Sequence, residues 1–231
     1  MKIAGLQRVT LIDFPDRIAA TVFIAGCNLD CGFCHNRWML DEREVDESMT
    51  LSDLYAWLRT RVGKLDGICI TGGEPLMAEG LADLCREIKS LGLEVKLDTN
   101  GLFPARLASL MAEGLLDYVA MDVKAPLDKR YSQACGVEVD LGVLERTMAL
   151  LRVGQVPWEF RTTVHPFLER ASLLGIARAL QPTDAWVLQP FVAAETVREE
   201  VRGRSHLSVE ELEALLPMLR TLVPAVWLRA G

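Results

Sequence analysis

The chain has 231 residues, half of them hydrophobic, and its 25 Lys and Arg against 32 Asp and Glu give a formal net charge of −7. This composition suits a globular chain with a large core, and it lacks the clustered positive charge that nucleic-acid binding requires. The start has no apolar signal region, and no apolar run is long enough to cross a bilayer. We therefore expect a cytoplasmic protein with no nucleic-acid or membrane partner.

Short apolar runs, rich in residues that favour β-strands, alternate along the chain with segments whose apolar residues have the spacing of a helix. A capping box of Thr50 and Asp53 opens one helix, and another of Ser208 and Glu211 opens the last one. A helix from Leu81 has one apolar face and ends at Gly92. The runs that we predict as strands are 19–24, 68–70, 95–97, 118–123, 158–164, 186–188 and 226–228.

Strands that alternate with helices predict a parallel sheet built from right-handed crossovers. The runs are too few for the eight strands of a closed barrel. We predict an α/β fold, an incomplete TIM-type barrel of about six parallel strands with outer helices. We expect a single domain over residues 1–231, and a flat doubly wound sheet is the structural alternative.

Polar residues follow the predicted strands at the point where each strand ends. In a parallel barrel these carboxyl ends share one face, and that face carries the active site. The strand ends lead into Gly26-Cys27, Thr71–Pro75, Asp98–Gly101, Asp122 with Lys124, His165-Pro166 and Gln189-Pro190.

Three of the six cysteines lie within eight residues, at Cys27, Cys31 and Cys34. Thiolates are soft ligands that suit zinc or an iron–sulfur cluster. A structural zinc ion and a fully ligated four-iron cluster each require four protein ligands. Three cysteines would leave one iron open to a cofactor or substrate.

The other cysteines do not offer an evident fourth ligand. Cys69 lies in an apolar strand, Cys85 on a helix face and Cys135 in a distant loop. We interpret the first two as small buried hydrophobic residues and leave Cys135 undecided. A Cys₃His zinc site with His35 is the alternative, although His35 adjoins Cys34 and gives poor chelate geometry.

The cysteine spacing, with the aromatic Phe33 before the last cysteine, resembles the radical S-adenosylmethionine superfamily. The further motifs are similar to those of the activating enzymes of glycyl radical enzymes. The opening of the chain is most like the activating protein of the anaerobic ribonucleoside-triphosphate reductase. The resemblance covers roughly residues 3 to 190. It is carried by Gly5–Gln7, Thr10–Pro15, Cys34-His35-Asn36-Arg37, Gly72-Gly73-Glu74-Pro75, Asp98-Thr99-Asn100-Gly101 and Asp122-Val123-Lys124.

The resemblance implies a 4Fe–4S cluster on Cys27, Cys31 and Cys34, with S-adenosylmethionine bound at the open iron. A reductant such as flavodoxin or ferredoxin would supply the electron. The reduced cluster would cleave S-adenosylmethionine to methionine and a 5′-deoxyadenosyl radical. That radical would generate a glycyl radical on a partner enzyme. Because the cofactors carry this chemistry, no catalytic side chain beyond them is expected.

The resemblance also implies cofactor-binding residues outside the cysteines. Gly72 and Gly73 would let the backbone approach the cofactor, and Glu74 would accept a hydrogen bond from its methionine ammonium. Lys124 matches a position near the methionine carboxylate. Phe33 would stack on adenine, although ordinary loop packing is an equal alternative.

Six further residues complete the predicted set. Asp98, Thr99 and Asp122 match positions that hold a monovalent cation in some activases, so such a cation is a candidate cofactor here. Arg161 and His165 are predicted cofactor contacts. Asn100 would shape the adenosine pocket, with a tight turn as its alternative. Lys124 and Arg161 could instead be ion-pair partners of Asp122 or Glu159.

Two other functions stay open. The first is a radical enzyme that acts on a small molecule or peptide, such as the enzymes that make 7-carboxy-7-deazaguanine. The second is a non-enzymatic iron–sulfur protein. The uninterrupted sequence Cys34–Arg37 favours the activase, and the missing fourth cysteine argues against the non-enzymatic protein. The charged stretch Arg198–His206 is interpreted as a solvated loop, or as a docking segment.

Overall fold

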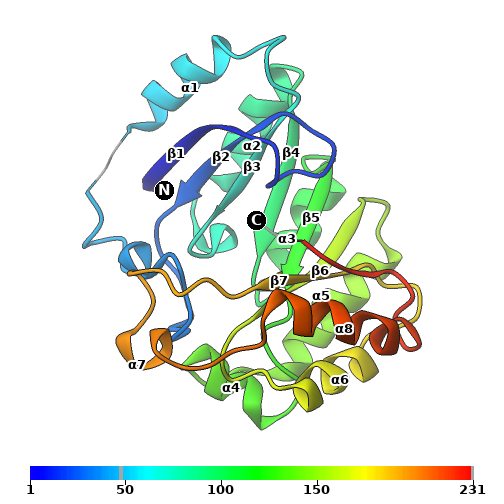
Figure 1. The fold of residues 1–231 in the computed structure, drawn as a ribbon. Helices are drawn as coiled ribbons and strands as arrows, with labels where there is room; N and C mark the ends of the chain where they lie inside the picture. The colour runs from blue at the N-terminus through cyan, green and yellow to red at the C-terminus, as the bar shows by residue number, and fades with distance from the viewer. Residues whose placement is uncertain (47–48, 230–231) are drawn as a thin grey trace. The chain divides into compact units, whose positions relative to one another are not determined.

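The computed structural model describes residues 1–46 and 49–229, which form an α/β fold (Figure 1). The strands of these residues are β1 (Ile3–Thr10), β2 (Ala19–Ile24), β3 (Gly67–Gly72), β4 (Glu94–Thr99), β5 (Tyr118–Asp122), β6 (Trp158–Val164), β7 (Trp186–Pro190) and β8 (Val226–Leu228). The helices are α1 (Leu51–Arg59), α2 (Leu81–Ser90), α3 (Pro104–Ala112), α4 (Lys129–Cys135), α5 (Leu141–Val153), α6 (Arg170–Ala179), α7 (Glu199–Arg202) and α8 (Val209–Arg220). Short 3-10 turns lie at Arg37–Met39 and Pro75–Met77.

The strands follow one another in chain order across one sheet, from β1 to β8. β2, β3 and β4 pair in parallel, as do β6, β7 and β8. The register places Ile24 opposite Gly72, so β2 and β3 end together. All seven predicted strands are present, and the predicted α/β class with a parallel sheet is confirmed.

The strand β1 was not predicted from the sequence, and it pairs antiparallel with β2. The residues Gln7, Arg8 and Val9 of β1 are exposed in succession, and Gly5 interrupts the strand. The apolar and polar alternation that identifies a strand is therefore absent.

The predicted helix starts are confirmed by their caps. Thr50 accepts a hydrogen bond from the Asp53 amide, and Asp53 accepts one in return from the Thr50 amide. Ser208 and Glu211 form the same reciprocal pair. These side chains satisfy amides that have no partner inside the helix.

The contacts within the chain divide it into two compact units that alternate along the sequence. The first unit contains Met1–Asn28, Trp38–Ala120 and Arg146–Pro157, and so carries β1 to β4. The second contains Leu29–Arg37, Met121–Glu145 and Trp158–Gly231, and so carries β6 to β8. The single domain over residues 1–231 stays a prediction.

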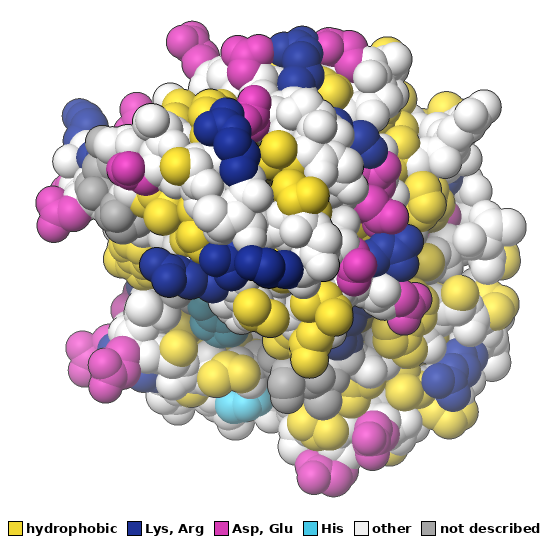
Figure 2. All heavy atoms as spheres, turned by 90° about the horizontal axis from the view of Figure 1, so that it is seen from above, with side chains coloured by type: hydrophobic (Ala, Val, Ile, Leu, Met, Phe, Trp, Pro, Cys, Tyr) yellow, Lys and Arg dark blue, Asp and Glu magenta, His cyan; other side chains and the backbone are white. Residues whose placement is uncertain are grey.

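Charge is mixed on the surface. Acidic and basic side chains lie among one another on the face shown in Figure 2. Within the described residues, no helix combines the length and the apolar character that crossing a bilayer demands.

Candidate functional site

In the first unit, a turn of two glycines packs against the end of β2. A side chain at Gly72 would overlap the backbone of Ile24, and one at Gly73 would overlap the carbonyl oxygen of Gly26. Gly72 also has a φ of 122°, which other residues rarely adopt. The Gly73 amide donates to the Ile24 oxygen at 2.9 Å, and the Glu74 amide donates to the Gly26 oxygen at 2.8 Å. The glycine turn is therefore fixed to the residue that precedes Cys27.

The carboxylate of Glu74 joins this turn to the end of β4. It is 1% exposed and accepts hydrogen bonds from the Thr99 hydroxyl at 2.9 Å and the Asn100 amide at 2.6 Å. It also accepts a hydrogen bond from the Leu76 amide at 3.1 Å. The Asn100 side chain in turn donates to the Asn28 side chain at 2.8 Å, directly after Cys27 in the sequence. The structure thus brings together three predicted residues, Glu74, Thr99 and Asn100.

Asp98 forms an ion pair that the sequence analysis did not expect. Lys96 is fully buried, and its ammonium pairs with the Asp98 carboxylate. The same ammonium lies 3.7 Å from the Cys69 sulfur on β3. Residues two apart on a strand face the same side, and a buried charge must be paired. A lysine inside an apolar strand, two residues before an aspartate, is the sequence signal that could have identified this pair.

In the second unit, Cys31 and Cys34 lie on a short turn in which the Cys34 amide donates to the Cys31 oxygen at 3.1 Å. The Asn36 amide also donates to the Cys34 sulfur at 3.3 Å. Burial raises the pKa of the Cys34 thiol, while the Asn36 amide and the Lys124 ammonium oppose that rise. None of the six cysteines forms a disulfide. The thiols are therefore neutral in the cluster-free chain, and it is their soft sulfur donors that fit an iron–sulfur cluster.

Cys135 lies closer to this turn than its place in the sequence suggested. A hydrogen bond with Cys135, followed by burial, raises the pKa of Cys31 well above its usual value. The backbone oxygen of Cys135 also accepts from the Asp30 amide at 2.9 Å. Cys69 and Cys85 are fully buried, as expected for small core residues.

Asp122 at the end of β5 is held between two cations. Its carboxylate lies 2.9 Å from the Lys124 ammonium and 2.9 Å from the Arg161 guanidinium. Burial alone would raise the pKa of Asp122, but the charges of Arg161 and Lys124 bring it well below its usual value. Glu159 pairs with Arg229 instead, through two contacts of 2.8 Å. The sequence left open whether Lys124 and Arg161 pair with Asp122 or with Glu159, and in the structure both pair with Asp122.

Phe33 and His165 stack on one another, with ring centres 3.9 Å apart and an angle of 13° between the rings. The His165 Nε2 lies 2.9 Å from the Lys124 oxygen, and the Phe167 amide lies 3.3 Å from the His165 Nδ1. A carbonyl can only accept and an amide can only donate, so Nε2 carries the single proton. Burial lowers the pKa of His165 to about 4, which keeps the ring neutral at neutral pH. One face of Phe33 is consequently covered by a neutral ring.

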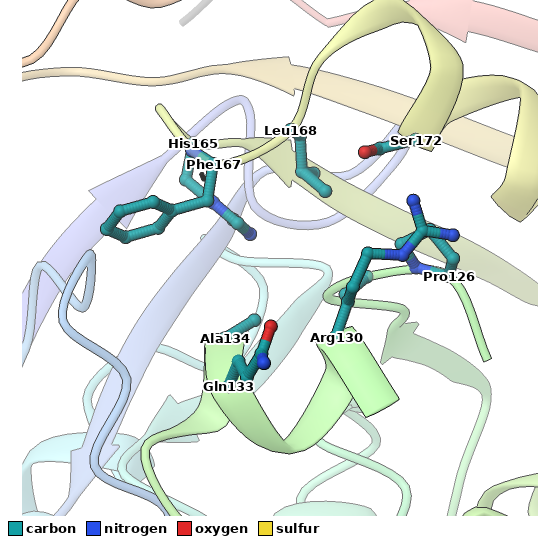
Figure 3. A pocket seen from close by; sticks show the side chains of 9 residues that line it. Pro126, Arg130, Gln133, Ala134, His165, Phe167, Leu168 and Ser172 are labelled. Carbon is teal, nitrogen blue, oxygen red and sulfur yellow. Dashed lines mark hydrogen bonds between the residues drawn. The ribbon is translucent and has the colours of Figure 1, made fainter. Parts of the chain in front are cut away.

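A cavity of about 250 Å³ lies beside His165. Figure 3 shows Arg130 and Gln133 on α4 facing Phe167 and the side chains that follow β6. The cavity therefore opens among the segments after β5 and β6, where parallel α/β folds place their ligands.

The carboxylates predicted to bind a monovalent cation are already paired with cationic side chains, so the structure gives no support for that ion. Asp98 already faces Lys96, and Asp122 faces both Lys124 and Arg161. Among the described residues, no three His, Cys, Asp or Glu side chains surround a point as one metal ion requires. A 4Fe–4S cluster differs, because each cysteine binds a separate iron and the sulfurs are spread around the cluster.

Sequence comparison relates the chain to one family. The model of the radical SAM superfamily matches residues 21–180. A protein of Methanocaldococcus jannaschii, named "Putative glycyl-radical enzyme activating enzyme", is 30% identical over 98% of this chain and 95% of its own length. A "Probable GTP 3',8-cyclase" of Saccharolobus islandicus is 29% identical over 65% of this chain, and the match covers 51% of that protein.

Comparison with solved structures supports the same fold. SuiB of Streptococcus suis, bound to S-adenosylmethionine, matches 89% of this chain with a TM-score of 0.69 and 13% identity. The match covers 48% of the SuiB chain, so this chain spans about half of SuiB. A domain of a pyruvate-formate lyase-activating enzyme from Bacteroides vulgatus matches 71% of this chain and 98% of its own, with a TM-score of 0.55 and 17% identity.

The neutral His165 predicts a pH dependence of stability. The pKa of His165 is about 4 in the folded chain, below the usual histidine value of 6.5, so protons bind the unfolded chain more readily. The free energy of unfolding should therefore fall as the pH is lowered from 6.5 towards 4, with His165 contributing up to about 3 kcal/mol. Urea unfolding of the cluster-free chain should show a flatter profile in His165→Gln. The exposed His206→Gln is the control, and equal profiles in both variants would contradict the assignment.

The internal ion pairs predict that S-adenosylmethionine binds without a monovalent cation. The affinity of cluster-loaded protein should change by less than about twofold when tetramethylammonium replaces potassium, because Lys96 already neutralises Asp98. Lys96→Met removes that internal cation and should make the affinity depend on potassium. A large loss of affinity in the wild-type protein without potassium would contradict this prediction and would indicate that a monovalent cation takes part in binding.

Proposed function

The chain belongs to the radical SAM superfamily, and from that premise we propose that it activates a glycyl radical enzyme. The observation that carries the proposal is the similarity to the Methanocaldococcus jannaschii protein, which extends over 98% of this chain. The match also covers 95% of that protein. The given sequence has no cysteine after Cys135, and an accessory cluster in that part of the chain would need more thiols.

In this proposal Cys27, Cys31 and Cys34 hold the 4Fe–4S cluster. When bound and reduced, the cluster supplies the electron that splits S-adenosylmethionine into methionine and a 5′-deoxyadenosyl radical. The chain's own task is to bind and orient. The Lys124 ammonium, already oriented by Asp122, would face the methionine carboxylate, and charge-assisted hydrogen bonds of this kind are strong.

In the first unit, the glycine turn and Glu74 are the residues that we assign to S-adenosylmethionine binding. Gly72 and Gly73 expose the backbone of the turn, and Glu74 keeps this turn fixed to Thr99 and Asn100. A side chain that accepts three protein hydrogen bonds acts mainly by positioning the residues around it. We therefore assign Glu74 a role in fixing the cofactor pocket, besides any direct contact with the methionine ammonium.

The proposed partner is the anaerobic ribonucleoside-triphosphate reductase, with flavodoxin or ferredoxin as the reductant. The support for this partner is the opening sequence, Gly5–Gln7 and Thr10–Pro15. These residues lie on β1 and in the segment that leads to β2.

Electron paramagnetic resonance tests the proposal. The protein is loaded with iron and sulfide without oxygen, reduced, and mixed with S-adenosylmethionine and the reductase. A glycyl radical signal should appear on the reductase and should vanish when its acceptor glycine is replaced by alanine. Cys34→Ala should abolish the signal, whereas Cys85→Ala, which alters a buried helix residue, should retain it.

The small-molecule alternative gives a different result in this experiment. It is favoured by the match to the GTP 3',8-cyclase of Saccharolobus islandicus, although that match covers half of the cyclase. Cleavage of S-adenosylmethionine without a radical on any glycyl radical enzyme would support this alternative and contradict the activase.

Replacing Glu74 tests the cofactor pocket. Glu74→Ala leaves the Thr99 hydroxyl and the Asn100 and Leu76 amides without their acceptor, so the turn should loosen. The dissociation constant of S-adenosylmethionine, measured by equilibrium dialysis, should rise by about tenfold or more, since hydrogen bonds to charged groups contribute about 1.5 to 3 kcal/mol. The iron content should not change. The exposed Glu79→Ala is the control, and unaltered affinity in Glu74→Ala would remove Glu74 from the site.

A further inference from the structure

The segment that follows β7, residues 191–206, packs against the part of the cysteine loop that belongs to the same unit. We name residues 191–206 the strap. It contains α7, which lies beside the loop after β2 in Figure 1. The strap begins beyond residue 180, where the superfamily match ends. It includes the charged stretch for which the sequence offered only a solvated loop or a docking segment.

Arg198 makes the central contacts of the strap. Its backbone amide donates to the Gly32 oxygen at 3.2 Å, and its guanidinium forms an ion pair with Asp30. Val201 lies so close to Gly32 that a side chain there would approach it to 3.1 Å. The strap is thus bound on both sides of Cys31 by backbone, charge and close packing.

Asp30 is fixed from three directions. Its carboxylate accepts from Arg37 at 2.7 Å as well as from Arg198, and Arg37 also reaches the Cys31 oxygen at 3.3 Å. Its amide donates to the Cys135 oxygen at 2.9 Å. Asp30 therefore connects α4, the strap and the turn that carries the cysteines.

A second group of contacts lies after Cys34. The His35 Nε2 is 2.8 Å from the Val192 oxygen, and the His35 ring lies 5.8 Å from that of Phe191. Phe191 contacts His206 edge to face at 5.2 Å, which closes the strap on itself. The strap consequently contacts residues 30, 32 and 35, which flank both cysteines of this unit.

A loop that must present thiolates in one geometry loses conformational entropy when it binds a cluster. Contacts that already hold the backbone on both sides of each cysteine reduce that loss, which is the principle of preorganisation. The Arg198 and Asp30 side chains are 36% and 43% exposed, so the pair contributes little to global stability. Its effect should be local to the loop.

We propose that Arg198 is a positioning residue that holds the Cys31–Cys34 turn in its cluster-binding conformation through Asp30 and Gly32. The role of the strap is thus to support the metal ligands from the C-terminal part of the chain. This inference rests on the proposed cluster at Cys31 and Cys34.

Hydrogen exchange on the cluster-free chain tests the proposal first. In Arg198→Gln, amides of residues 30–35 should exchange about fivefold faster, while those of the β3 and β4 strands keep their wild-type rates. Arg198→Lys keeps a positive charge and should restore part of the protection. Arg43→Gln breaks an exposed pair with Asp41 and serves as the matched control.

Release of iron from the reconstituted protein to an excess of chelator provides the second readout. Release should be about fivefold faster in Arg198→Gln and at least as fast in Asp30→Asn, which also loses the pair with Arg37, and the double variant should be no faster than Asp30→Asn. Additive effects, or wild-type exchange and release in Arg198→Gln, would overturn the proposal while leaving the proposed function intact. A wild-type protein that assembles no cluster would contradict both.

Discussion

Carboxylates that are buried or partly buried at the ends of parallel strands need partners, and this constraint shapes both units. Glu74 accepts three hydrogen bonds, Asp98 faces the Lys96 ammonium, and Asp122 lies between Lys124 and a guanidinium. A buried charge without such partners would cost several kcal/mol, so each pair fixes the strand end that carries it. The polar residues of the predicted site are consequently held in place before any cofactor binds.

The sequence was informative where the signal is local. Short apolar runs predicted seven strands, and capping boxes predicted two helix starts. The residues Gly72-Gly73-Glu74-Pro75 predicted the glycine turn. The turn also has a physical reason, since side chains at Gly72 and Gly73 would overlap the backbone of the neighbouring strand. Comparison with known proteins then confirmed the superfamily that the cysteine spacing had indicated.

Partners that lie far apart in the sequence could not be predicted. Asp30 and Arg198 are separated by 168 residues, and the sequence around either residue gives no indication that the two form an ion pair. The contact between Cys135 and Cys31 could not be predicted either. Cys135 is the last residue of α4, and this helix was not predicted from the sequence. The pairing of Lys96 with Asp98 differs, since strand periodicity alone puts both side chains on the same side.

Each unit holds its own group of predicted site residues. The first contains a glycine turn and a polar strand end, and the second contains two cysteines, an oriented ammonium and a neutral aromatic stack. Support for the cysteines comes from α4 and from the strap, outside the cysteine motif itself.

The most direct test of the central claim is the cleavage of S-adenosylmethionine itself. The protein is loaded with iron and sulfide without oxygen, reduced, and assayed for 5′-deoxyadenosine and methionine. If the proposed function holds, both products should appear in equal amounts and only when reductant is present. A cluster that forms but cleaves no S-adenosylmethionine, even with candidate partners added, would contradict it. The fourth protein ligand of such a closed cluster should then be sought at Cys135, which already contacts Cys31.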